Sequence, residues 1–327
     1  MKKSLVLGAG GFIGSHMVKR LKSEGFYVVG IDLKYPEFSK SEADKFYICD
    51  LTNFNEFETI IIEEERFDEI YQYAADMGGA GFIFTGENDA KIMQNSISIN
   101  LNLLSILEKT YENLRKVKVF YSSSACIYPQ EIQLDTNNPG LKENDAYPAN
   151  PDSEYGWEKL FSERLYQSFN KNFNLDIRIA RFHNIYGPEG TWNGGKEKVP
   201  AAVCRKVAKA EHKGEIEIWG DGKQTRSFLY IEDCIEATRR LMNSKYIYPV
   251  NIGSEEMVSV NELVKIVSDI AGKELTISHI DGPLGVRGRN SNNDLIKEIL
   301  NWEYSFSLEQ GIKETFGWIQ KQIYLNS

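Results

Sequence analysis

The chain has 327 residues, of which 42% are hydrophobic and 26% are charged. This composition is that of a folded globular protein, and it excludes collagen-like, low-complexity and disordered chains. The length predicts about two domains, or one large domain with an appended lobe. The 38 Lys and Arg against 47 Asp and Glu give a net charge of −9. Because no Lys/Arg-rich run segregates the positive charge, a nucleic-acid partner is not expected.

The sequence carries no signal for membrane insertion or secretion. No stretch approaches the roughly 18 consecutive apolar residues of a membrane span, and no small-residue cleavage site follows the N-terminus. The four cysteines, Cys49, Cys126, Cys204 and Cys234, are far apart and form no C-x-x-C pair. We therefore predict no membrane span, no metal site and no dense disulfide framework, and we expect a cytoplasmic location.

The N-terminal residues have the pattern of a strand, a glycine turn and a helix. An apolar run over 4–7 leads into Gly8, Gly11 and Gly14, and a helical pattern then continues over 15–24. Glycines at this spacing allow a tight turn, close approach of a pyrophosphate and tight helix packing, while the helix N-terminus offers N–H donors. The pattern predicts a dinucleotide-binding turn, with Phe12 and Ile13 among its contacts.

Two carboxylates extend this predicted site. Asp32 closes the next predicted strand, over 27–31, where a carboxylate accepts hydrogen bonds from an adenosine ribose and repels a 2′-phosphate. This position favours NAD over NADP as the cofactor. Asp50 is a further candidate contact at the adenine end. The alternative remains open that the glycines only form a turn and that Asp32 only caps a loop.

Further apolar runs over 69–75, 117–122 and 176–181 alternate with helical patterns. Such alternation predicts an α/β fold, a Rossmann-type doubly wound parallel sheet with helices on both faces. From about Gly187 the pattern changes to a loop followed by short elements. We expect an NAD-binding domain over 1–186 and a smaller C-terminal α/β lobe, mainly substrate-binding, over 187–327. A strand candidate at 249–252 is placed to return to the main sheet.

Tyr155 and Lys159 stand four residues apart in a predicted helix and therefore share one of its faces. A tyrosine hydroxyl has an ordinary pKa near 10, so it acts as a base at neutral pH only beside a cation, which Lys159 supplies. The strand ending at Ser124 brings a hydroxyl toward the same substrate oxygen. Alone, Y-x-x-x-K is common by chance and would be an exposed pair. After a dinucleotide turn and a serine-tipped strand, it predicts an oxidation site.

With these motifs, the chain resembles the extended short-chain dehydrogenase/reductase superfamily over almost its whole length. Within it, six segments are similar to the GDP-mannose 3,5-epimerase family: 75–83, 123–129, 181–188, 194–202, 219–227 and 285–291. The resemblance implies that Tyr155 and Lys159 work with NAD to oxidise C4 of a GDP-hexose. It also implies that Cys126 and Lys198 exchange protons at C3 and/or C5 before re-reduction. A C4 ketone acidifies both flanking C–H bonds, so such a proton-exchanging pair fits the chemistry.

The same resemblance implies a set of substrate contacts. They are Gly78, Ser124, Ala125, Cys126, Asn184, Glu197, Lys198, Lys206, Gln224, Thr225, Arg226 and Arg289. Arg226 and Arg289 suit a diphosphate, because a guanidinium fork matches phosphate oxygens. The structural alternatives are a buried small hydrophobe at Cys126, a solvated lysine at Lys198 and surface salt bridges at the arginines. The segment 84–90 differs from the plant enzymes, which leaves GDP-mannose and a GDP-manno-heptose, or its 4-keto form, as candidate substrates.

Two other functions remain open at this point. The same fold could serve a GDP-sugar C4 dehydrogenase or reductase, or a single-centre epimerase. A catalytically silent NAD-binding scaffold is the third alternative, against which the intact Tyr155, Lys159, Cys126 and Lys198 argue. The resemblance further implies a homodimer formed through two long helices, at about 97–111 and 155–170.

Overall fold

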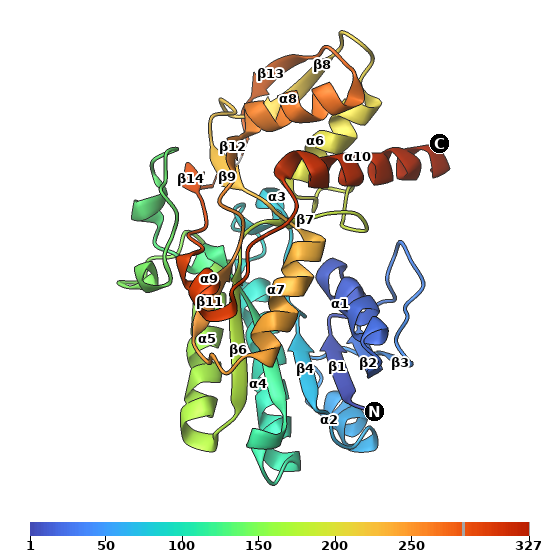
Figure 1. Ribbon diagram of the computed structural model, residues 1–327, viewed down its shortest axis with the longest axis vertical. Coiled ribbons are helices and arrows are strands. Elements are labelled where there is room, and N and C mark those ends of the chain that lie inside the picture. Colours follow the sequence, from blue (N-terminus) through green and yellow to red (C-terminus); the bar gives the residue numbers. More distant parts are fainter. Residues whose placement is uncertain (283–284, 327) are drawn as a thin grey trace.

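The computed structural model describes residues 1–282 and 285–326, and its centre is a parallel sheet (Figure 1). The sheet has seven strands in the order β11-β6-β5-β4-β1-β2-β3. They are β1 (Lys3–Leu7), β2 (Tyr27–Asp32), β3 (Lys45–Ile48), β4 (Glu69–Gln72), β5 (Lys118–Ser124), β6 (Asp176–Phe182) and β11 (Pro249–Ile252). Every pairing within it is parallel. The predicted Rossmann-type α/β fold is confirmed.

Helices cover both faces of this sheet. Successive strand residues point to opposite sides, so apolar side chains emerge on both faces and both must be buried. On one face, Val6 of β1 belongs to a core cluster with α1 (Phe12–Ser23) and α7 (Ile231–Asn243). On the other face, Leu5 and Leu7 pack in a cluster with three further helices. These are α2 (Phe54–Glu63), α4 (Asp89–Thr110) and α5 (Glu154–Phe173).

Two element boundaries differ from the sequence prediction. Helix α1 begins at Phe12 rather than near residue 15, since its first turn faces a cavity and so lacks the apolar period of a core-facing helix. Strand β4 ends at Gln72 rather than at residue 75. The N–H of Ala74 donates to the side chain of Gln72 at 2.9 Å instead of continuing the sheet ladder.

A smaller lobe lies at the top of Figure 1. It contains the parallel pair β8 (Glu215–Trp219) and β13 (Thr276–Ile280) with helices α6 (Val199–Lys209), α8 (Val260–Ala271) and α10 (Leu308–Leu325). Below it, β9 (Thr225–Ser227) pairs with β12 (Met257–Ser259) and β14 (Gly288–Arg289), and β7 (Ile185–Tyr186) pairs with β10 (Leu229–Tyr230). Residues after 187 also return to the main sheet as α7, β11 and α9 (Asp294–Leu300). The remaining short helices are α3 (Ala80–Ile83), η1 (Leu114–Lys116), η2 (Ala125–Ile127), η3 (Gln130–Gln133) and η4 (Glu143–Ala146).

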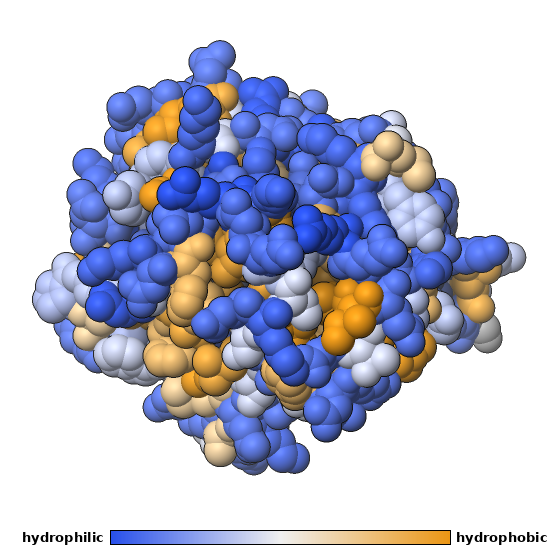
Figure 2. Space-filling view, turned by 90° about the horizontal axis from the view of Figure 1, so that it is seen from below, coloured by the Kyte–Doolittle hydropathy of each residue, from blue (hydrophilic) through white to orange (hydrophobic). Residues whose placement is uncertain are grey.

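The surface seen from below is mainly hydrophilic, with small hydrophobic areas between the polar side chains (Figure 2). Among the helices of residues 1–282 and 285–326, none is long and apolar enough to cross a membrane. The hydrophobic side chains gather instead in the layers between sheet and helices.

Candidate active site

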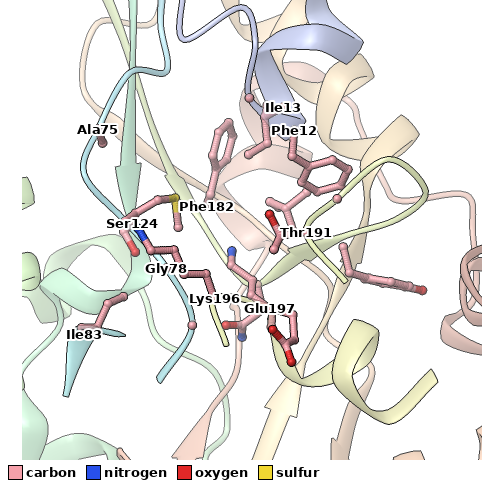
Figure 3. Close-up of a pocket in the computed structure, with 18 of the residues that line it drawn as sticks. Phe12, Ile13, Ala75, Gly78, Ile83, Ser124, Phe182, Thr191, Lys196 and Glu197 are labelled. Carbon is pink, nitrogen blue, oxygen red and sulfur yellow. The ribbon is translucent and has the colours of Figure 1, made fainter. Parts of the chain in front are cut away.

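A cavity of about 830 Å³ lies at the carboxyl ends of the sheet strands, against the C-terminal lobe. This is the edge at which open parallel sheets bind their ligands. Figure 3 shows that its walls come from separate segments of the chain. They are the start of α1 (Phe12, Ile13), the loop after β4 (Ala75, Gly78), the ends of β5 (Ser124) and β6 (Phe182), and the segment before α6 (Thr191, Lys196, Glu197).

The glycine turn between β1 and α1 has the form that a pyrophosphate site requires. A Cβ at Gly14 would lie 2.0 Å from the Gly8 carbonyl oxygen, and one at Gly8 would lie 2.8 Å from the Ala74 nitrogen. Gly8 also has a φ of +82°, which glycine adopts without a steric penalty. Gly11 caps α1 and has no side chain to occupy the N–H groups of the first turn. The turn therefore offers bare backbone and a helix N-terminus to an anion.

The sequence analysis did not single out Gly10, but the structure leaves no room for a side chain at this position either. A Cβ there would lie 2.0 Å from the Lys34 carbonyl oxygen, and the Gly10 N–H donates to Asp32 Oδ2 at 2.9 Å. Burial raises the pKa of the Asp32 carboxyl, and the Gly10 and Lys34 N–H groups act against that rise. Asp32 is thus fixed at the cavity wall. Asp50 also lines the cavity, with its Oδ1 accepting from the N–H of Thr52.

Tyr155 and Lys159 lie on the face of α5 that meets the cavity, with exposed fractions of 5% and 3%. The ammonium of Lys159 donates to the Ser122 carbonyl at 3.1 Å and lies 5.7 Å from the centre of the Tyr155 ring. Burial lowers the pKa of Lys159. Burial also raises the pKa of Tyr155 well above its ordinary value, while the Ser124 hydroxyl acts to lower it. The two side chains form a compact unit at the end of β5.

Cys126 follows β5 in the short helix η2, and its N–H donates to the Ser124 hydroxyl at 3.2 Å. It is half-buried, whereas Cys49, Cys204 and Cys234 are buried. Lys198 approaches the same cavity as the N-cap residue of α6. Burial lowers the pKa of Lys198, and the charge of Cys126 acts in the opposite direction. The thiol and the amine therefore line one cavity and interact electrostatically.

Most of the remaining predicted contacts also line this cavity. They are Gly78, Ala125, Asn184, Glu197, Lys206, Gln224, Arg226 and Arg289. Thr225 is not among the lining residues, and its hydroxyl donates to the Thr136 carbonyl at 2.6 Å. Because residues alternate along β9, its neighbours Gln224 and Arg226 point toward the cavity while Thr225 points away.

Arg226 is a cation with backbone partners. Its guanidinium donates to the carbonyls of Thr225 and Val286, at 2.8 and 2.6 Å. Burial, followed by the charge of Arg289, lowers the pKa of Arg226 to about 9. A guanidinium in such surroundings gains from an anion placed beside it.

Arg289 has different partners. It is 4% exposed, and its three nitrogens donate to Gln133 Oε1 at 2.5 Å, Cys126 Sγ at 3.1 Å and Asp152 Oδ2 at 2.9 Å. The sequence did not indicate Gln133 or Asp152 as site residues. They lie 156 and 137 positions from Arg289, so no local pattern connects them.

The family model of the NAD dependent epimerase/dehydratase family matches residues 4–253. This chain belongs to that family. The family's cofactor is the NAD that the glycine turn and Asp32 predict, and the turn described above has room for no side chain where the pyrophosphate would lie. The resemblance to the extended dehydrogenase/reductase superfamily is confirmed.

Relatives within the family agree with this placement. The GDP-mannose 3,5-epimerase of Arabidopsis thaliana is 48% identical over 323 residues, which cover 98% of this chain and 83% of that protein. The UDP-glucuronate 4-epimerase of Thermodesulfobacterium geofontis is 29% identical over 335 residues, which cover 98% of this chain and 97% of that protein. Among solved structures, the UDP-glucose 4-epimerase of Thermotoga maritima with UDP-glucose has a TM-score of 0.85 at 26% identity, covering 98% of this chain and 99% of that one. The UDP-glucuronic acid 4-epimerase of Bacillus cereus, in complex with UDP-glucuronic acid and NAD, has a TM-score of 0.81 at 25% identity, covering 98% and 100%.

Proposed function

We propose that this protein epimerises a GDP-hexose at C3 and/or C5, by transient oxidation at C4, and is an isomerase of the GDP-mannose 3,5-epimerase type. The observation that carries the proposal is the meeting of Tyr155, Lys159, Cys126 and Lys198 in one cavity beside the glycine turn. The identity of 48% to an epimerase of that name supports the same reaction. Carboxylates in place of Ala125 and Cys126 would favour a dehydratase instead, and both are missing here.

NAD held at the glycine turn and Asp32 would supply the hydride acceptor for oxidation at C4 and the hydride donor for re-reduction, and its positive charge would favour the ionised form of Tyr155. Tyr155 takes the proton of the C4 hydroxyl, and Ser124 donates to the same oxygen. Lys159 is held by the Ser122 carbonyl and adds a positive charge beside the tyrosine. When the reaction is reversed, Tyr155 returns the proton to the C4 oxygen, so the enzyme is regenerated.

Cys126 and Lys198 carry the proton exchange in this proposal. The C4 ketone makes the protons on C3 and C5 acidic, so one group removes a proton and the other delivers one to the opposite face. Burial lowers the pKa of Lys198, which increases the fraction of neutral amine able to accept a proton near neutral pH. After one inversion the base has gained a proton and the acid has lost one, so proton exchange with solvent restores both groups for the next turnover.

The electrostatics of the cavity support an anionic substrate. Arg226 holds its positive charge among backbone carbonyls, and Lys206 also lines the cavity. A nucleoside diphosphate would bring the negative charge that these cations need. The sugar is proposed as mannose or a manno-heptose, because segment 84–90 includes cavity-lining Phe84 and departs from the plant enzymes.

Deuterium incorporation tests the function. The enzyme would be incubated with GDP-mannose and, separately, with a GDP-manno-heptose in heavy water, and the products assigned by NMR. We expect deuterium at C3 and C5 of the recovered sugar without net formation of NADH. Cys126→Ser and Lys198→Met should slow exchange by about 100-fold or more, whereas Lys209→Met, on the exposed end of α6, should not. Unlabelled sugar, or NAD consumed in proportion to sugar, would contradict the proposal.

We also propose a homodimer and a cytoplasmic location. Support for the dimer comes from α4 and α5, which pack side by side and expose Leu101, Trp157 and Phe161 by 41, 39 and 47%. Exposed aromatic and aliphatic side chains on neighbouring helices are typical of an interface. Support for a reducing location comes from the cysteines, because all four in the chain are free.

A further inference from the structure

The surroundings of the Cys126 sulfur point beyond the proposed reaction. The Arg289 Nη1 lies 3.1 Å from Cys126 Sγ. An arginine has only donors, so the sulfur must be the acceptor in this contact. A sulfur accepts most strongly as the thiolate, since a bond between two opposite charges is stronger than one between neutral groups. The geometry therefore favours the ionised form of Cys126.

We propose that Arg289 stabilises the thiolate of Cys126, and that Asp152 and Gln133 are positioning residues that aim the guanidinium at the sulfur. This inference rests on the proposed proton-exchange role of Cys126, but its physical content is independent of substrate. It changes the role of Arg289, which the sequence assigned to substrate binding.

Two side chains, Gln133 and Asp152, hold the Arg289 guanidinium in place. Its Nε donates to Gln133 Oε1 at 2.5 Å, and Gln133 in turn donates to the carbonyls of Tyr128 and Pro129, both at 3.0 Å. Its Nη2 pairs with the Asp152 carboxylate, which is 3% exposed. With Nε and Nη2 held, Nη1 is directed at the sulfur. Burial disfavours the charge of Arg289, but Cys126 and Asp152 outweigh it and raise the pKa of the guanidinium.

Other charged groups near the Cys126 thiol also affect its ionisation. The groups that interact electrostatically with Cys126 are Lys198, Lys159, Arg226, Tyr155 and Arg289. Arg226 is a cation and acts in the same direction as Arg289, and Lys198 and Lys159 do so in their protonated forms. Asp152 is the counter-charge of this group, since it pairs with Arg289 directly. Removing Arg289 and neutralising Asp152 must therefore affect the thiolate in opposite directions.

Alkylation of Cys126 by iodoacetamide tests, without substrate, whether Arg289 stabilises the thiolate. The reagent attacks the thiolate, and the other three cysteines are buried, so the half-buried Cys126 on the cavity wall is the accessible target and Cys126→Ser is the blank. The full-length protein would be alkylated from pH 5 to 9 and the modified peptide quantified by mass spectrometry. For Arg289→Met, we expect the pH profile to move upward by about one unit or more. For Asp152→Asn, which keeps an acceptor but loses the charge, we expect a shift of about half a unit downward.

Matched variants separate this from a general structural effect. Arg287→Met removes a cation two residues away that pairs with Asp221, and it should leave the profile unchanged. Gln133→Met removes an acceptor without changing charge, and it should move the profile in the same direction as Arg289→Met but less. If Arg289→Met does not fold, the isosteric Asp152→Asn still decides. The proposal is overturned if Arg289→Met leaves the profile in place, or if Asp152→Asn leaves it in place or moves it upward. Failure of deuterium exchange alone would reject only the proposed function.

Discussion

At the scale of single residues, we expect Asp32 to set the choice between NAD and NADP. Its Oδ2 is held by the Gly10 N–H, so the carboxylate stays at the cavity wall where the adenosine ribose would lie. Replacing it by Asn keeps an acceptor but removes the negative charge that repels a 2′-phosphate. We expect Asp32→Asn to lower the ratio of the NADP to the NAD dissociation constant by about tenfold.

Titration of the purified protein with each dinucleotide, followed by calorimetry, measures this ratio. Glu37→Gln serves as the control. Glu37 lies in the loop that follows Asp32, and its exposed carboxylate forms an ion pair with the Lys34 ammonium at 3.5 Å. A ratio that moves equally in both variants would mean that the general charge of the loop, rather than Asp32, discriminates between the dinucleotides.

Residues related by local spacing could be predicted from the sequence, and residues related only by tertiary contact could not. Tyr155 and Lys159 share a helix face, so their approach follows from four-residue spacing. The partners of Arg289 lie more than a hundred positions away, so no local pattern could indicate them, and the substrate-binding role that the resemblance implied for Arg289 stays a prediction. Gly10 was missed because the G-x-x-G-x-x-G template passes over it.

At the scale of elements, the packed pair α4 and α5 is the proposed dimer interface. Trp157 and Phe161 lie one helical turn apart on α5, and Leu101 is exposed on α4. A charge in the centre of such a face is costly to bury. We expect Phe161→Glu to raise the dimer dissociation constant by at least about tenfold. Sedimentation velocity should then give the mass of one chain where the wild type gives twice that mass.

Tyr324→Glu provides the matched control for that measurement. Tyr324 is an aromatic residue of α10 with an exposed fraction of 84%, and it lies far along the chain from both helices. It should leave the sedimenting mass unchanged. A wild-type protein that sediments as a single chain would contradict the dimer.

The main sheet was more predictable than the lobe for a physical reason. Strands buried on both faces contain short apolar runs, as in residues 5–7 of β1 and 28–31 of β2, and these runs are visible in the sequence. Strands β9, β12 and β14 have two or three residues each, too few to show a period. Their pairing depends on contacts across the fold, so the sequence predicted only short elements there.

At the scale of the whole molecule, a buried hydrogen-bond network ties the two halves of the chain together. His183 follows β6, and its Nε2 lies 3.0 Å from Asn251 Oδ1 on β11. The Tyr128 hydroxyl donates to the same oxygen at 2.6 Å. His183 is fully buried, and burial lowers its pKa to about 3. Protonation of this histidine therefore opposes folding.

The pH dependence of unfolding follows from this shift. A histidine in the unfolded chain takes up a proton near pH 6.5, whereas His183 in the folded chain does so only near pH 3. Between these values the unfolded state binds more protons, so stability is full above about pH 6.5 and falls as the pH decreases. From pH 7 to 5.5 we expect the wild type to lose about 1 kcal/mol more than His183→Gln in urea unfolding. His212→Gln, at an exposed histidine, should lose as much as the wild type, and an equal loss in His183→Gln would show that His183 is not the group responsible.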